Sequence, residues 1–126
     1  MATLNIIIVE DEMITSEYLK DMLEDLGHNV TGIYLRASKA LEAVNAHKPD
    51  FVLLNFNIKA ENSGIWLAEQ LREIHNVPYI FMVSYAHRSV IEKATIKHPC
   101  GYLLKPIKKQ HLATAIQQGR EKWKYQ

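Results

Sequence analysis

Several apolar stretches of this sequence end on side chains that could do chemistry together. Glu10 and Asp11 follow one such stretch, and Asn55, Val83-Ser84 and Lys105 stand at the ends of three others. Two neighbouring carboxylates need a positive charge beside them, which either a Mg²⁺ ion or Lys105 could supply. The amide of Asn55 is not a nucleophile at neutral pH. These residue types predict a charged polar pocket in which Asn55 undergoes no covalent chemistry.

The elements that must position these residues alternate between strand and helix. The four apolar residues 51–54 are typical of a strand buried on both faces, and similar runs predict strands at 4–9, 78–83 and 101–104, with a weaker one at 28–35. Apolar residues at helical spacing predict five helices, around 14–26, 37–44, 65–74, 90–94 and 112–119. This order predicts a doubly wound, five-stranded parallel α/β sheet with five helices. The carboxyl ends of its strands converge at one edge.

The first of these helices carries a broad apolar stripe. Ile14, Tyr18, Met22 and Leu26 recur every four residues, with Leu19 and Leu23 beside them, and Gly27 follows as a good stop signal. This spacing predicts a helix with one wide apolar face.

Length and composition predict a single domain. The chain has 126 residues, 48% of them hydrophobic, and a net charge of +1, so no overall charge attracts nucleic acid or a membrane. A single cysteine, Cys100, excludes an internal disulfide framework. No apolar run approaches the ~20 residues of a membrane span, and the first residues lack the plan of a signal peptide. We expect a cytoplasmic protein with one domain over 1–126 and a core at about 4–120.

In order and spacing, these residues resemble the receiver domain of two-component response regulators. The likeness extends from about Leu4 to Arg120 and rests on Val9-Glu10-Asp11-Glu12, the apolar strand before Asn55, Gly64, and Gly101-Tyr102-Leu103-Leu104-Lys105-Pro106. The resemblance implies a CheY-like, flavodoxin-like fold and a role in phosphorelay signalling, not an enzyme. In such domains the acid pair holds Mg²⁺, and an aspartate at the end of the central strand takes a phosphoryl group from a histidine kinase. The lysine then pairs with that group.

Carried over to this chain, the resemblance assigns a role to each matching residue. Glu10, Asp11 and the backbone carbonyl of Asn57 would hold Mg²⁺, Lys105 would pair with phosphate, and Tyr102 would be the aromatic switch. The Lys105-Pro106 peptide bond would be cis. A histidine kinase or an output protein would bind the face made by the fourth helix, fifth strand and last helix, within 87–97 and 108–122. A homodimer through that face is an alternative.

Two departures from the family pattern decide what we expect of the pocket. The phosphoacceptor position is Asn55, which cannot form an acyl phosphate. The position of the usual Thr or Ser falls on Val83, which has no hydroxyl, and Ser84 occupies the next position. We therefore expect a domain that does not accept phosphate, binds Mg²⁺ more weakly than an active receiver, and acts through protein–protein interaction.

Other accounts of the sequence remain as alternatives. A natural pseudo-receiver and an engineered Asp→Asn variant would both carry Asn55; Val83 favours the first, and intact Glu10, Asp11 and Lys105 favour the second. A small flavodoxin-like enzyme or nucleotide-binding module is remote, because no glycine-rich phosphate loop follows the first strand. The six histidines show no metal-ligand spacing, which indicates scattered surface or loop residues (His28, His47, His75, His87, His98 and His111).

Overall fold

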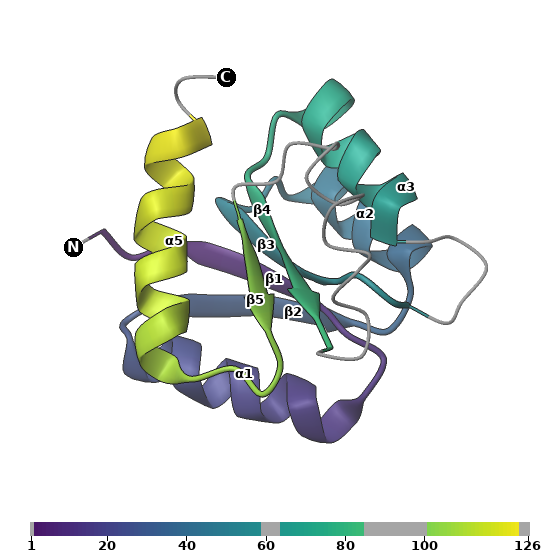
Figure 1. Cartoon of the computed structure of the whole chain (residues 1–126). Coiled ribbons are helices and arrows are strands. Elements are labelled where there is room, and N and C mark those ends of the chain that lie inside the picture. The colour runs from purple at the N-terminus through teal and green to yellow at the C-terminus, as the bar shows by residue number, and fades with distance from the viewer. Residues whose placement is uncertain (1, 59–63, 85–100, 124–126) are drawn as a thin grey trace.

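The computed structural model describes residues 2–58, 64–84 and 101–123, and these form one parallel sheet with helices on both of its faces (Figure 1). The five strands lie in the order β2-β1-β3-β4-β5. Their bounds are β1 Asn5–Val9, β2 Asn29–Tyr34, β3 Phe51–Asn55, β4 Tyr79–Val83 and β5 Tyr102–Leu104. The predicted doubly wound, five-stranded parallel sheet is confirmed.

Helices α1 and α5 cover one face of the sheet, and α2 and α3 cover the other (Figure 1). Their bounds are α1 Met13–Asp25, α2 Ala37–Ala46, α3 Gly64–Gln70 and α5 Lys109–Trp123. A π-helical turn, η1 Leu71–His75, continues α3 and ends at Asn76, whose φ is 53°. The helix predicted around 90–94 lies outside the described residues. Within the described part of the chain, no helix has the length and apolar character needed to cross a membrane.

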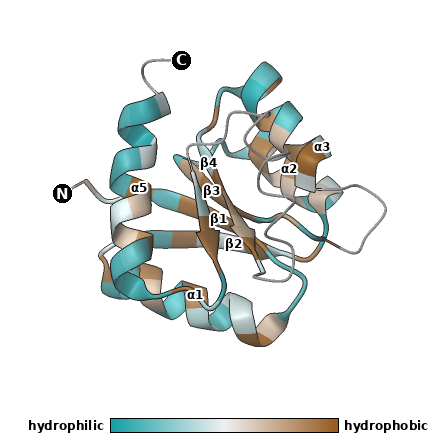
Figure 2. Cartoon of the chain, viewed as in Figure 1, coloured by the Kyte–Doolittle hydropathy of each residue, from teal (hydrophilic) through white to brown (hydrophobic). Residues whose placement is uncertain are grey.

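The alternation of side chains along each strand divides the core into two layers. Ile7 and Val9 of β1 pack with residues of α2 and α3, whereas Ile6 and Ile8 pack with residues of α1 and α5. Every residue of the central strands β3 and β4 is buried, because a helix layer covers each face of the sheet. Figure 2 shows the apolar strands enclosed between helices of mixed character.

The apolar stripe predicted for α1 is only partly buried. Leu19, Met22 and Leu23 lie in the core, but Ile14 is 87% exposed and Tyr18 is 55% exposed. Residues four positions apart on a helix share a face only approximately, so a wide stripe can extend beyond the surface that the sheet covers. The amino-terminal half of α1 therefore presents apolar side chains to solvent.

His28 is a loop residue, as expected, but it does not lie on the surface. This residue lies between α1 and β2 and is only 5% exposed. Its Nδ1 accepts a hydrogen bond from the backbone N–H of Leu4, at 3.1 Å, which satisfies a buried donor just before β1. Burial lowers the pKa of His28, and the positive charge of Arg120 lowers it further.

Candidate functional site

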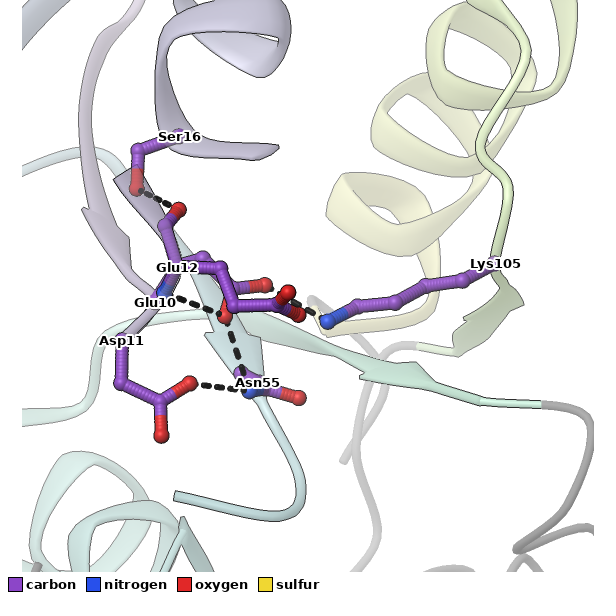
Figure 3. A network of polar contacts seen from close by, with 6 residues as sticks. All are labelled: Glu10, Asp11, Glu12, Ser16, Asn55 and Lys105. Carbon is purple, nitrogen blue, oxygen red and sulfur yellow. Dashed lines mark hydrogen bonds and ion pairs between the residues drawn. The ribbon is translucent and has the colours of Figure 1, made fainter. Parts of the chain in front are cut away.

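The carboxyl ends of three strands bring the predicted polar residues together. Glu10 follows β1, Asn55 is the last residue of β3, and Lys105 follows β5. Strand β1 pairs directly with β3, with Val9 opposite Leu54, so that Glu10 and Asn55 emerge side by side. Strand β4 separates β3 from β5, and the long side chain of Lys105 reaches across this edge of the sheet (Figure 3).

Four polar contacts join these residues into one network (Figure 3). The ammonium Nζ of Lys105 lies 2.6 Å from Oε1 of Glu10. The amide Nδ2 of Asn55 donates to Oε2 of Glu10 at 3.0 Å and to Oδ1 of Asp11 at 3.3 Å. The backbone N–H of Glu12 also donates to Oε2 of Glu10, at 3.2 Å. Both carboxylate oxygens of Glu10 are therefore engaged.

Glu10 is the buried centre of the network. Its side chain is fully shielded from solvent, whereas that of Lys105 is 20% exposed. Burial raises the pKa of Glu10, while the hydrogen bond and charge of Lys105 oppose that rise, and the hydrogen bond with Asp11 adds to it. The site thus combines two acids, one ammonium and one neutral amide.

Gly64 explains how α3 can begin so close to the site. A Cβ atom at this position would lie 2.9 Å from the backbone oxygen of Asn55 and 2.8 Å from that of Phe56. Glycine is therefore required by the close approach of the start of α3 to the end of β3. Gly64 is the first described residue of this helix.

The structure also describes the remaining predicted site residues. Val83 ends β4 and is buried, Ser84 beyond it is partly exposed, and Asn57 is exposed. Tyr102 is 40% exposed on β5. The Lys105-Pro106 peptide bond is cis, as the resemblance implied.

Sequence reasoning missed two features beside the network. Ser16 on α1 is buried and its Oγ donates to the backbone oxygen of Glu12 at 2.9 Å, which supports the turn that carries the acids. A cavity of about 440 Å³ also lies between α1 and the segment after β5; it is lined by Ile14, Thr15, Tyr18, Leu19, Lys105, Pro106 and Ile107. The apolar residues of α1 were the available signal, but their spacing equally suits a buried face.

The oxygen atoms of the site are of the kind that Mg²⁺ prefers, but their arrangement does not fit a bound ion. Both oxygens of Glu10 and one oxygen of Asp11 accept hydrogen bonds from protein donors. No group of three or more His, Cys, Asp or Glu residues suited to a metal occurs in the described ranges 2–58, 64–84 and 101–123. The N–H groups of Asn55, Glu12 and Lys105 therefore provide the hydrogen bonds that these carboxylate oxygens need.

Comparisons with known proteins agree with this geometry. The model of the response regulator receiver domain family matches residues 6–117. The transcriptional regulatory protein PdtaR of Mycobacterium tuberculosis is 27% identical over 112 residues, which cover 89% of this chain and 54% of that protein. The phyllosphere-induced regulator PhyR of Methylorubrum extorquens is 29% identical, over 94% of this chain and 44% of the relative. The chain thus spans about half the length of these curated relatives.

Solved structures give the same result. The signal receiver domain of a modulated diguanylate cyclase from Desulfovibrio desulfuricans superposes with a TM-score of 0.89 and 27% identity, covering 98% of both chains. The receiver domain of PhyR from Erythrobacter litoralis has a TM-score of 0.80 and 31% identity, with 94% of this chain and 91% of that chain covered.

Proposed function

This chain belongs to the response regulator receiver domain family of two-component signalling, and from that premise we propose that it is a receiver that takes no phosphoryl group at Asn55 and acts through protein–protein contacts. A receiver domain is a signalling module, not an enzyme in the usual sense, and its family implies a histidine kinase as partner. The observation that carries the proposal is the amide side chain of Asn55 at the end of β3.

The surroundings of Asn55 support a pocket without covalent chemistry. An acyl phosphate needs a carboxylate oxygen as nucleophile, and the lone pair of an amide nitrogen is delocalised into its carbonyl. Here that nitrogen also donates hydrogen bonds to Glu10 and Asp11. Lys105, the residue that would pair with a phosphoryl group, already bonds Glu10. Among the residues that the structure describes, the two at the acceptor and phosphate-binding positions, Asn55 and Lys105, are thus already engaged by the acids.

Val83 supports a natural loss of phosphorylation over an engineered substitution. It ends β4 and is 1% exposed, so it contributes a methyl group where a receiver of the usual kind would present a hydroxyl. An Asp→Asn change made to trap one state would leave the fourth strand untouched. The two departures together favour a pseudo-receiver, in which both the acceptor and the residue that senses phosphate differ.

Two surfaces are candidates for partner binding. On β5, Tyr102 and Leu104 are each 40% exposed, and they belong to the face expected to bind a kinase, an output protein or a second copy of the chain. The segment in which the sequence predicts the fourth helix of that face lies outside the described residues. The apolar side chains of Ile14 and Tyr18 on α1 line the cavity beside Lys105, which supports a second docking surface.

Intact-mass spectrometry after incubation with acetyl phosphate and Mg²⁺ tests the proposal. We expect the protein to gain no mass, because the residue at the acceptor position, Asn55, has no carboxylate oxygen to act as nucleophile. The Asn55→Asp variant serves as the comparison: one added phosphoryl group would identify Asn55 as the only chemical lesion, whereas none would show that the pocket has changed beyond that residue. Phosphorylation of the unmodified protein within the pocket would refute the proposed function.

A further inference from the structure

We propose that the amide of Asn55 and the ammonium of Lys105 together replace the divalent cation in this pocket, so that the folded domain has no dependence on Mg²⁺. This inference rests on the proposed function, in which the site is the pocket of a receiver domain that takes no phosphoryl group. Its basis is the pair of contacts from one amide nitrogen, at 3.0 Å to Glu10 and at 3.3 Å to Asp11. A single group thus bridges the two acids, which is the task of a metal ion in such a pair.

The charges of the pocket explain why an amide can do this and a carboxylate cannot. The two acids and Lys105 leave one net negative charge when residue 55 is neutral. An aspartate there would add a second, with its oxygen about 3 Å from both existing carboxylates, and like charges at that distance require a cation between them. Asn55 instead presents two N–H donors, one for each acid.

Burial makes the hydrogen bonds of Asn55 necessary. Asn55 is 6% exposed and Glu10 is 0% exposed, so neither can exchange its partner for bulk water. In the part of the chain that the structure describes, every buried polar side-chain atom has a hydrogen-bond partner. A Mg²⁺ ion would have to displace the Asn55 amide from both acids and leave its N–H groups buried without acceptors. The existing network therefore competes directly with the metal.

The same network reaches the candidate docking surface on α1. Lys105 bonds Glu10 through its ammonium, and its side chain also lines the cavity that contains Ile14 and Tyr18. The buried ion pair therefore ties the segment after β5 to the segment that begins α1. Because the ion pair between Lys105 and Glu10 forms without a metal, the cavity beside Ile14 and Tyr18 forms without one as well.

Thermal unfolding with and without 10 mM MgCl₂, at matched ionic strength, tests the inference. We compare the protein with Asn55→Asp and with Asn45→Asp, a matched control that adds the same charge at an exposed position of α2. The melting temperatures of the protein and of Asn45→Asp should change by less than about 1 °C on adding Mg²⁺. Without Mg²⁺, Asn55→Asp should melt at a lower temperature than the unsubstituted protein. Adding Mg²⁺ should raise the melting temperature of Asn55→Asp by roughly 5 °C, because the metal then binds only the folded state. An equal response of the protein and Asn55→Asp, or none in Asn55→Asp, overturns the proposal.

A direct binding measurement covers the case in which Asn55→Asp does not fold without metal. Free Mn²⁺, counted by electron paramagnetic resonance, should not decrease when the unsubstituted protein is added at about 100 μM. Binding with a dissociation constant below about 1 mM at this pocket, lost in Glu10→Gln, would overturn the inference. Such a result would leave the proposed function intact, because metal binding does not make Asn55 a nucleophile. Phosphorylation of another residue in the pocket would refute the proposed function but leave the inference about Mg²⁺ intact.

Discussion

Replacing Lys105 with methionine should destabilise the domain in a pH-dependent way. The variant keeps most of the apolar stem but removes the ammonium that lies 2.6 Å from the buried carboxylate of Glu10. Removing one partner of a buried ion pair typically costs about 3–5 kcal/mol, because the other charge remains buried without compensation. Glu10 has 0% exposure, whereas Lys105 keeps 20%, so the orphaned group is the carboxylate.

Protonation of Glu10 sets an upper limit on this electrostatic loss. An ordinary glutamate has a pKa of 4.5, and protonating it at pH 7 costs about 3.4 kcal/mol, at 1.36 kcal/mol per pH unit. Because the pKa of folded Glu10 already lies above 4.5 with Lys105 present, the loss should stay below about 3.4 kcal/mol at pH 7 and below about 0.7 kcal/mol at pH 5. Without Lys105 the pKa of folded Glu10 rises further, so the folded state binds more protons than the unfolded state above pH 4.5. The stability of the variant should thus fall as pH rises through that window.

Urea unfolding monitored by circular dichroism at pH 7 and pH 5 provides the measurement. Lys109→Met is the matched control, because Lys109 lies 3.7 Å from Asp25 in an exposed pair and its removal should cost less than about 0.5 kcal/mol at either pH. Adding Glu10→Gln to Lys105→Met should recover part of the loss at pH 7. A loss of equal size at both pH values, or one below about 0.5 kcal/mol at pH 7, would refute the reasoning.

Three further outcomes follow from burial and close packing. Gly64→Ala should destabilise by about 1–3 kcal/mol because its Cβ would approach a backbone oxygen to 2.8 Å. Gly101→Ala should change stability little, because no atom of the described residues lies within 4 Å of its Cβ, and urea titration distinguishes the two. Ile14 is 87% exposed, so Ile14→Glu should alter stability by less than about 0.5 kcal/mol. Leu19 is 1% exposed, so Leu19→Ala should cost about 2–5 kcal/mol of stability. His28→Asn keeps an acceptor for the backbone but removes the titrating ring. Because the pKa of His28 is lowered in the folded state, the unsubstituted protein should lose stability as the pH falls below 6.5. Denaturation at several pH values should show a smaller loss of stability in His28→Asn.

The sequence was sufficient to predict the sheet and to bring four site residues together. Periodicity alone does not distinguish strand from helix in an apolar run such as 51–54, but its short length and the Pro49-Asp50 before it favour a strand, so the order of elements followed. Once the strands are parallel, their carboxyl ends must share an edge, and Glu10, Asp11, Asn55 and Lys105 meet there. The position of each residue at a strand end thus carried the prediction.

The sequence could not predict features that depend on how far one element covers another. Helical spacing places Ile14 and Leu19 on one broad stripe, but only packing in three dimensions decides that one is exposed and the other buried. His28 is buried where it accepts a hydrogen bond from the backbone N–H of Leu4, a residue distant in sequence, and local pattern does not reveal that partner. Which atoms of Glu10 accept hydrogen bonds, and from which donors, likewise depends on side-chain geometry.

The ion pair between Lys105 and Glu10 also has a consequence for the order of folding events. Its partners are separated by 95 residues, and β5 joins the sheet only through β4, which in turn pairs with β3. Contacts of such long sequence separation carry a high entropic cost of loop closure and form after the local ones. Lys105 should therefore close the network late, with a φ-value near zero, so that its removal speeds unfolding and leaves the folding rate almost unchanged. The ion pair therefore contributes to kinetic stability, because it slows unfolding once the domain has folded.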